Sequence, residues 1–140
     1  MERSLVIVKP DAVARNLGGT IISRLEALGL RLVALKMLHM TQDLAHRQYA
    51  VHEGKSFFNE LVRYMTSAPV IAAVFEGEKA VEAIRKAAGL TDPAKAGKGT
   101  IRGDYGLSVT QNSVHASDST ETAEKEIKIF FSEKEIVDRE

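Results

Sequence analysis

The sequence predicts an α+β protein, an α/β sandwich in which amphipathic helices pack on a small sheet. Short apolar runs rich in β-branched residues suit buried strands, and segments with a helical period of apolar residues lie between those runs. The order β-α-β-α-α-β-α-loop-β-α fits a ferredoxin-like βαββαβ core with an antiparallel sheet and added helices. With 140 residues and no interdomain linker, we expect a single domain over residues 1–140.

The first part of the chain supplies two strands and the helix between them. Residues 5–8 (LVIV) are a continuous apolar run closed by a Lys-Pro pair, which is typical of a strand buried on both faces. Residues 18–29 place apolar side chains at helical spacing, with Thr20 suited to cap the helix and Gly29 suited to end it. Strand character returns over residues 30–40.

Two further helices, a strand and another helix follow. Residues 41–51 and 56–66 are predicted helices, and the second has apolar residues at i, i+3, i+4 and i+7. Residues 69–75 (PVIAAVF) indicate another buried strand, and residues 77–88 form an amphipathic helix. Residues 90–106 are rich in glycine and lysine and have weak periodicity, so we expect the longest loop there.

The last helix follows the final strand, after Val114. Asp118 is predicted to cap this helix, with Glu121 three residues later completing a capping box. The expected buried stripe of the helix consists of Ala123, Ile127, Phe130 and Phe131.

The composition excludes several classes of function. The 19 basic and 19 acidic residues give a formal net charge of 0, which argues against a nucleic-acid or membrane partner bound through bulk charge. The absence of cysteine excludes disulfides, thiolate catalysis and sulfur-ligated zinc. The apolar run at the N-terminus is too short for a signal peptide or a membrane span, so we expect a cytoplasmic location.

The run NSVHASD at residues 112–118 places His115 just before the last helix. A helix N-terminus favours an anion such as phosphate, and a neutral imidazole can attack phosphorus without a base to activate it. Glu126 follows eleven positions later, two turns into that helix, where its carboxylate could orient the imidazole. A solvated glutamate is an equally good interpretation of Glu126, and an ordinary structural role is commoner for a lone histidine.

Basic residues outside helix faces are candidates for phosphate binding, because phosphoryl transfer needs fixed cations around the moving group. Lys9 lies at the end of the first strand, and Arg102 lies in GTIRGD. Arg85 lies on the flank of an amphipathic helix, where a solvated arginine is the commoner explanation.

Other candidate motifs are incomplete. The Walker phosphate-binding pattern fails because Gly99 follows the lysine where a serine or threonine belongs. His39, His46 and His52 lack the i, i+4 spacing of helical metal ligands, so we expect ordinary surface positions for them.

Over nearly its whole length, the sequence resembles the nucleoside diphosphate kinase family. Four motifs carry the resemblance in the expected order: KPDAV at residues 9–13, FFNELVRYMTSAPV at 57–70, GTIRGDYG at 99–106 and NSVHASD at 112–118. The last, of the form NxxH[GA]SD, is highly specific. The resemblance implies a ping-pong phosphotransferase whose histidine takes the γ-phosphoryl group of a nucleoside triphosphate, typically ATP. The group is held as phosphohistidine and passed to a different nucleoside diphosphate.

The resemblance also assigns roles to individual residues. His115 matches the catalytic histidine, and Ser117 and Glu126 match the residues that support it. The residues that match the family's phosphate and ribose contacts are Lys9, Arg85, Thr91, Arg102 and Asn112, with Tyr49 near the histidine. The residues that match its base contacts are Phe57, which stacks on the base, and the apolar Leu61 and Val109.

The same resemblance implies the substrates, the metal and the assembly. Stacking without a required hydrogen bond to a base edge implies broad tolerance for ATP and other nucleotides. Mg2+ is implied to arrive with the nucleotide phosphates rather than in a protein cage, and Asp118 could touch the ion through water. We expect a homo-oligomer, either a hexamer or a tetramer, with no nucleic-acid or membrane partner.

Departures from the family pattern are small, because Ala68 and Ala116 replace glycines with another small residue.

Two rival functions would require sequence features other than those found here. A ferredoxin-like regulatory module that binds a nucleotide without chemistry leaves the NSVHASD motif unexplained. An RNA-binding module on the same fold needs exposed aromatics and a basic face, whereas only 6% of the residues here are aromatic.

Overall fold

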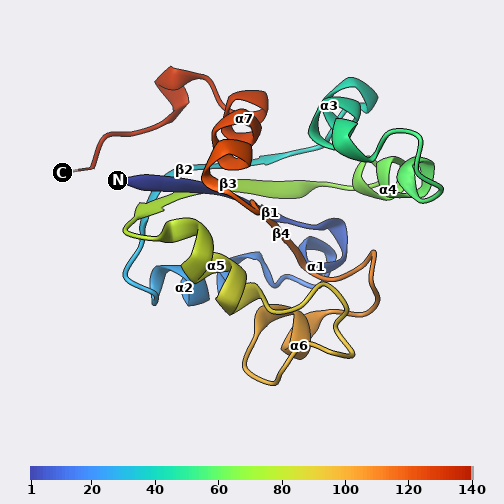
Figure 1. Cartoon of the computed structure of the whole chain (residues 1–140), viewed down its shortest axis with the longest axis horizontal. Helices are drawn as coiled ribbons and strands as arrows, with labels where there is room; N and C mark the ends of the chain where they lie inside the picture. Colours follow the sequence, from blue (N-terminus) through green and yellow to red (C-terminus); the bar gives the residue numbers. More distant parts are fainter. Residues whose placement is uncertain (140) are drawn as a thin grey trace.

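A four-stranded antiparallel sheet organises the fold, with helices on both of its faces (Figure 1). In this computed structural model, which describes residues 1–139, the strand order is β2-β3-β1-β4. The strands are β1 (Glu2–Val8), β2 (Arg31–Leu38), β3 (Val70–Gly77) and β4 (Val114–Ala116). Their order and antiparallel pairing confirm the predicted ferredoxin-like α+β fold.

Helices cover each face of the sheet. The lower face in Figure 1 carries α1 (Pro10–Ala14), α2 (Gly18–Glu26), α5 (Ala80–Ala88) and α6 (Ile101–Tyr105). The upper face carries α3 (Gln42–Gln48), α4 (Phe58–Met65) and α7 (Thr120–Phe130). Short 3₁₀ turns at Ala50–His52 and Glu133–Glu135 follow α3 and α7. Among residues 1–139, no helix combines the length and the apolar character needed to cross a membrane.

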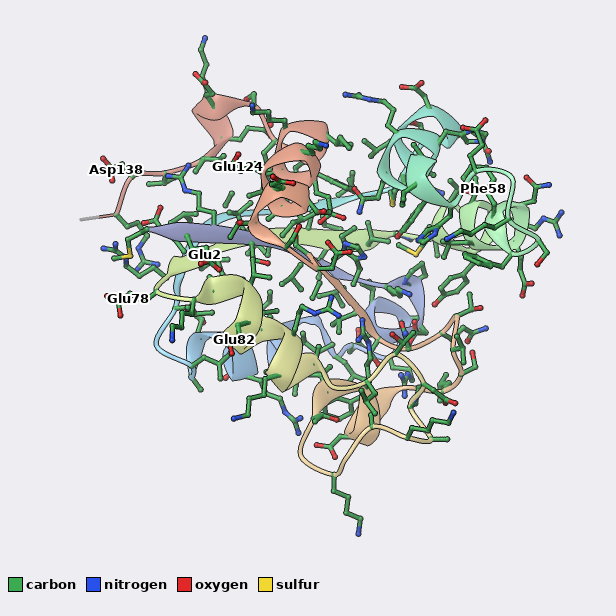
Figure 2. The ribbon with its side chains drawn as sticks, viewed as in Figure 1. Glu2, Phe58, Glu78, Glu82, Glu124 and Asp138 are labelled. Atoms are coloured by element: carbon green, nitrogen blue, oxygen red, sulfur yellow. The ribbon has the colours of Figure 1, made fainter. Side chains whose placement is uncertain are left out.

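Alternation along β1 divides the core into two layers. Leu5 and Ile7 pack with residues of α3, α4 and α7, whereas Val6 and Val8 pack with residues of α2 and α5. All four side chains are buried, as predicted for this run. Figure 2 shows side chains filling the space between sheet and helices on both sides. The strand is apolar throughout because neither of its faces meets water.

Two short helices occur where no sequence pattern predicts them. α1 begins at Pro10, whose fixed φ suits the first position of a helix. α6 lies inside the expected loop at residues 90–106, and the hydroxyl of Thr100 caps it by accepting a hydrogen bond from Gly103 N at 3.0 Å. Each helix has five residues, too few for a helical period of apolar positions to be recognisable.

Two predicted helix caps are wrong. α2 begins at Gly18, so Thr20 lies inside its first turn rather than ahead of it. α7 is capped by Ser119, whose hydroxyl accepts a hydrogen bond from Thr122 N at 3.1 Å, and Asp118 is exposed one position earlier. Ser119 has the extended backbone that a cap requires, with φ −156° and ψ 165°.

The other elements differ from expectation only at their ends. The helix expected over residues 77–88 begins at Ala80, because β3 extends to Gly77 and Lys79 has a left-handed φ of 51°. The helix expected over residues 41–51 becomes a 3₁₀ turn after Gln48. The chain leaves the α2 segment through Gly29, whose φ of 86° favours glycine.

Replacing Ser119 with alanine should lower the free energy of unfolding by about 1 kcal/mol, because Thr122 N loses its hydrogen-bond acceptor at the start of α7. Urea denaturation followed by circular dichroism would measure the change. Asp118→Ala is the matched control and should cost less than half as much. Equal losses in the two variants would contradict the assignment of the cap.

Candidate active site

β4 places His115 on the face of the sheet that α3 and α7 cover. Val114 and Ala116 are buried in the layer formed with α2 and α5, so alternation along the strand turns His115 to the opposite face. β4 is an edge strand, and His115 pairs with Ile7 of β1. The His115 side chain keeps 22% of its surface exposed, which leaves part of the imidazole accessible.

The carboxylate of Glu126 contacts this imidazole. Glu126 Oε2 lies 2.8 Å from His115 Nε2, and Glu126 Oε1 accepts a hydrogen bond of 2.7 Å from Ser117 Oγ. α7 carries Glu126 on its buried face, beside Ile127, and only 6% of the residue is exposed. Glu126 is therefore not a solvated helix residue, which was one of the two interpretations that the sequence allowed.

Ser117 joins this pair to the central strand β1. Its hydroxyl accepts a hydrogen bond from Leu5 N at 3.0 Å while donating to Glu126. Its backbone N donates to Leu5 O at 3.1 Å, which extends the pairing of β1 with β4 by one more position. Because Ser117 is completely buried, its hydroxyl holds the Glu126 carboxylate at a defined place relative to the sheet.

The charge state of Glu126 decides which imidazole nitrogen carries a proton. Burial by itself raises the pKa of Glu126, but the hydrogen bond and charge of His115, with hydrogen bonds from Ser117 and Gln48, hold that pKa below its ordinary value. The ionised carboxylate can only accept, so His115 Nε2 must donate across the 2.8 Å contact. In the neutral ring, Nδ1 is then left with a free lone pair.

Gln48 is a residue of this site that the sequence reasoning missed. Its Nε2 donates to Glu126 Oε2 at 2.8 Å and lies 3.3 Å from His115 Nε2. Gln48 is buried on α3 together with Ala45. Its spacing of three positions from Ala45 was the available signal, because a polar side chain on the buried face of a helix needs a hydrogen-bond partner.

Tyr49 lies beside the imidazole. The ring centroids of Tyr49 and His115 are 6.3 Å apart in an edge-to-face arrangement. The Tyr49 hydroxyl is buried and has no hydrogen-bond partner among residues 1–139. Burial, assisted by the negative charge of Glu126, raises the pKa of Tyr49, so the hydroxyl keeps its proton at neutral pH. Tyr49 therefore offers an unused hydrogen-bond donor next to His115.

Lys9 is a buried cation at the end of β1. Only 7% of the residue is exposed, and its Nζ donates to Thr110 O at 3.2 Å. Burial first, and then the positive charge of Arg102, lower the pKa of Lys9 to about 8, although Asp11 acts in the opposite direction. Two cations that repel each other in this way are stabilised when an anion such as phosphate binds between or beside them.

Backbone carbonyls hold the side chains of Arg102 and Asn112. Arg102 donates to Gly89 O at 2.8 Å and to Val114 O at 3.0 Å. Asn112 Nδ2 donates to Thr91 O at 2.9 Å. Arg102 Nε and Asn112 Oδ1 are both buried without a hydrogen-bond partner in the part of the chain that the structure describes. Both side chains are thus fixed in place with one polar atom still unused.

A pocket of about 420 Å³ lies between the end of α5, the loop that follows it and α6. Its lining includes Arg85, Thr91 and Arg102, which the sequence predicts as phosphate or ribose contacts. Arg85 and Thr91 are exposed. Lys86 also lines the pocket, and none of the lining residues is acidic. The pocket therefore has the charge that a nucleotide phosphate requires.

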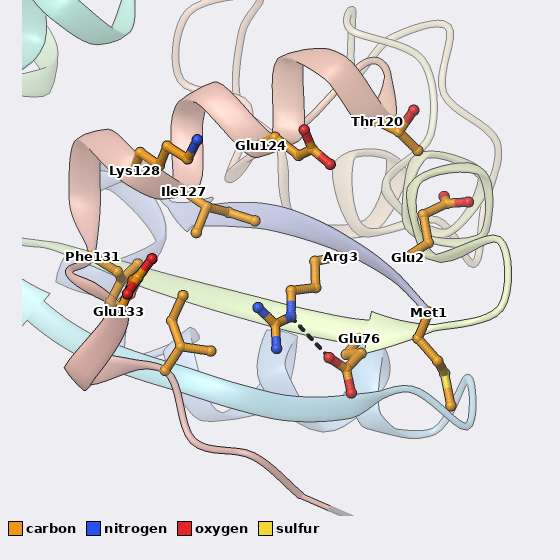
Figure 3. Close-up of a pocket in the computed structure, with 11 residues that line it drawn as sticks. Met1, Glu2, Arg3, Glu76, Thr120, Glu124, Ile127, Lys128, Phe131 and Glu133 are labelled. Carbon is orange, nitrogen blue, oxygen red and sulfur yellow. Dashed lines mark hydrogen bonds and ion pairs between the residues drawn. The ribbon is translucent and has the colours of Figure 1, made fainter.

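A second pocket, of about 600 Å³, lies between the start of β1, α7 and the segment that follows α7 (Figure 3). It contains none of the predicted site residues. Arg3 and Lys128 are its basic residues, and the acidic residues are Glu2, Glu76, Glu124 and Glu133. Figure 3 shows Arg3 directed at Glu76, with which it forms an ion pair of 2.8 Å. This excess of carboxylates disfavours a phosphate ligand, so the second pocket is not the candidate site.

The residues predicted to contact a base lie outside the hydrogen-bond network around Glu126. Phe57, just before α4, is 44% exposed, and its ring centroid is 5.2 Å from that of His52. Val109, which follows α6, is 57% exposed. Leu61 is partly buried against the core layer beneath α4. Phe57 and Val109 thus present apolar surface to solvent.

Metal ligands do not gather at this site. Within residues 1–139, no group of three or more histidine, aspartate or glutamate side chains could hold a metal ion. Asp118 is exposed, as are His39 and His46, whereas His52 is half-buried. Apart from one carboxylate, the side chains near His115 are instead cations and hydrogen-bond donors.

Comparisons with known proteins place this geometry in a family. The model of the family "Nucleoside diphosphate kinase" matches residues 2–136. The nucleoside diphosphate kinase of Dehalococcoides mccartyi is 57% identical over 137 residues, which cover 98% of this chain and 96% of that protein. The nucleoside diphosphate kinase of Archaeoglobus fulgidus is 54% identical over 140 residues, which cover 100% of this chain and 93% of that protein.

Solved structures agree with the sequence comparisons. A halophilic nucleoside diphosphate kinase from Halobacterium salinarum, in complex with CDP, has a TM-score of 0.97 and 46% identity, covering 99% of this chain and 93% of that one. The Aquifex aeolicus nucleoside diphosphate kinase has a TM-score of 0.94 and 44% identity, covering 97% of this chain and 99% of that one. The family match, the identities and the structural likeness agree, and the chain belongs to the nucleoside diphosphate kinase family.

Proposed function

We propose that this chain transfers the γ-phosphoryl group of a nucleoside triphosphate, typically ATP, to a nucleoside diphosphate through a phosphohistidine on His115. Nucleoside diphosphate kinase activity follows from the family, for which a ping-pong phosphohistidine mechanism is general. The observation that carries the assignment to His115 is its hydrogen bond to Glu126, which occupies Nε2 and leaves Nδ1 free to attack.

The transfer needs no separate base. In the first half-reaction, the Nδ1 lone pair forms the N–P bond while the bond between the γ-phosphorus and its bridging oxygen breaks, and that electron pair leaves with the diphosphate. The proton stays on Nε2, and Glu126 balances the positive charge that the ring acquires. In the second half-reaction, a terminal β-phosphate oxygen of another diphosphate attacks phosphorus, and the N–P electron pair returns to Nδ1.

The side chains around His115 are proposed to orient it and to stabilise the phosphate during transfer. Ser117 and Glu126 position the imidazole, because they hold each other at 2.7 Å. The proposed phosphate and ribose ligands are Lys9, Tyr49, Arg85, Thr91, Arg102 and Asn112. The unused polar atoms of Tyr49, Arg102 and Asn112 support this role, since an unpartnered buried polar atom costs about 1–3 kcal/mol that a ligand would recover.

The base is proposed to stack on Phe57, beside Leu61 and Val109. The exposed ring of Phe57 supports stacking, which every base accepts because every base has a π-face. We therefore propose broad base tolerance, with purine and pyrimidine nucleotides both used. The relative from Halobacterium salinarum was solved with CDP, a pyrimidine nucleotide.

Mg2+ is proposed to enter as part of the nucleotide substrate. Nucleotide kinases generally need a divalent metal, which would reduce the negative charge of the nucleotide phosphates. Mg2+ usually binds through phosphates, waters and one or two carboxylates, which fits this route. The exposed Asp118 is the proposed water-mediated contact.

A homo-oligomer, either a hexamer or a tetramer, is part of the proposal. β2 is an edge strand on which Leu35 and Met37 are 52% and 63% exposed, and association would cover this apolar surface. One sheet with a core layer on each face supports a single domain over residues 1–140. The cytoplasmic location and the lack of nucleic-acid or membrane partners stay predictions from the sequence.

His115→Ala should abolish exchange while the protein keeps its fold, because the nucleophile is lost. With γ-labelled ATP and magnesium, the unaltered protein should form an acid-labile, alkali-stable phosphoenzyme that loses its label to GDP. His46→Ala, which changes an exposed histidine of α3, is the matched control and should retain label and turnover. Substantial turnover by His115→Ala would refute the assignment, and ATP binding without labelling of the unaltered protein would favour a non-catalytic module.

Glu126→Gln should lower kcat by a factor of order ~10² and leave nucleotide affinity little changed, because the carboxylate orients the imidazole and does not contact the nucleotide. Steady-state kinetics and equilibrium titration with ADP would separate the two effects. Glu124→Gln, an exposed position on the same helix, is the control. Unchanged kinetics in Glu126→Gln would reduce Glu126 to a structural residue.

Affinity for ADP should weaken above pH 8, by up to about tenfold per pH unit, because the pKa of Lys9 is lowered to about 8 and only its protonated form attracts phosphate. Titration calorimetry from pH 7 to 9.5 would measure the effect. Lys9→Met should bind ADP more weakly, and its affinity should not change with pH in this range. Lys125→Met, on the exposed surface of α7, should keep the pH dependence of the unaltered protein. A pH-independent affinity in the unaltered protein would count against Lys9 as a phosphate ligand.

A further inference from the structure

Two donors share one oxygen of the Glu126 carboxylate. His115 Nε2 and Gln48 Nε2 each lie 2.8 Å from Glu126 Oε2, and the two nitrogens are 3.3 Å apart. Gln48 is only 7% exposed, so water competes little for this contact. The hydrogen bond also fixes which end of the Gln48 amide faces Glu126. If the amide were flipped, Gln48 Oε1 would face Glu126 Oε2, and neither oxygen can donate a hydrogen bond.

Gln48 is not needed to locate the carboxylate. Ser117 already holds Glu126 Oε1 at 2.7 Å, and α7 fixes the backbone of Glu126. What Gln48 adds is a second donor on the oxygen that faces His115. A carboxylate oxygen that accepts a second hydrogen bond becomes a weaker base and attracts the imidazole proton less strongly. The hydrogen bond from Gln48 is among the causes that lower the pKa of Glu126.

The basicity of this oxygen matters most in the phosphorylated protein. Once Nδ1 bonds to phosphorus with the proton still on Nε2, the imidazole carries a positive charge, which it lacks in the free protein. A more basic carboxylate therefore stabilises the phosphoenzyme more than it stabilises the free enzyme. Since both half-reactions share this intermediate, excessive stability would slow transfer to the second nucleotide.

We propose that Gln48 is a positioning residue that acts through Glu126 to limit the stability of the phosphohistidine, which keeps the phosphoryl group transferable. The proposal rests on the assignment of His115 as the nucleophile under the proposed function. It assigns to Gln48 a role in the energetics of the intermediate, through the hydrogen bond that its amide nitrogen donates to Glu126.

The test is the equilibrium between free and phosphorylated enzyme in Gln48→Met, which has a side chain of similar length without a donor. The protein is mixed with γ-labelled ATP, magnesium and ADP at a series of fixed ratios, and the acid-labile label is counted. The ATP to ADP ratio that half-phosphorylates the variant should fall about three- to tenfold, because one hydrogen bond to a charged group is removed. The rate of transfer from the isolated phosphoenzyme to GDP should fall by a similar factor.

Two further variants separate this role from a structural one. Gln48→Asn keeps the amide on a side chain one methylene shorter, which no longer reaches Glu126, so it should shift the equilibrium in the same direction. Gln42→Met removes the exposed glutamine of the same helix and should change nothing. ADP affinity, measured for all three, should stay close to that of the unaltered protein, and thermal unfolding should show that each variant is fully folded at the assay temperature.

The outcomes distinguish this proposal from the function on which it rests. An equilibrium that is unchanged, or shifted toward free enzyme, in both Gln48→Met and Gln48→Asn would overturn the role of Gln48 and leave His115 as the nucleophile. Failure of the unaltered protein to become labelled, or label that persists in His115→Ala, would overturn the proposed function and the role of Gln48 together.

Discussion

The buried carboxylate of Glu126 is the group on which the geometry of the site depends. An unpaired charge in a protein interior costs several kcal/mol, so a buried glutamate is tolerated only when donors surround it. Here His115 of β4, Ser117 just after that strand and Gln48 of α3 supply those donors. Hydrogen bonds to this one charge therefore link α3, β4 and α7, and they fix the imidazole in one tautomer.

The proposed phosphate-binding side of the site is built in the opposite way, because some of its polar groups are held in place without a full set of hydrogen-bond partners. Lys9 and Arg102 are cations close enough for Arg102 to lower the pKa of Lys9, and the buried hydroxyl of Tyr49 has no partner among residues 1–139. Such an arrangement reduces the stability of the empty protein and favours binding of an anion. The carbonyls that hold Arg102 and Asn112 keep both side chains in place before a ligand arrives.

The two edges of the sheet, β4 and β2, differ in what they expose. β4 forms one edge, where a strand of only three residues leaves His115 partly accessible while Val114 and Ala116 stay buried. β2 forms the other edge, where Leu35 and Met37 are exposed and suited to association. The paired strands β1 and β3 lie between them, so an assembly that covers β2 leaves the edge with His115 accessible.

The sequence by itself determined the features that depend on local patterns and motifs. The apolar run at residues 5–8 predicted a strand buried on both faces, and NSVHASD singled out His115. Only the tertiary structure decided the role open to Glu126, because a helix glutamate looks the same in sequence whether it faces water or a buried imidazole. The spacing of Gln48 from Ala45 indicates a buried polar side chain, but the sequence does not identify its partner, because Glu126 lies 78 positions away. Local sequence patterns depend only on residues that are close together in the chain. Hydrogen bonds to a buried charge depend instead on which distant segments the folded sheet brings together.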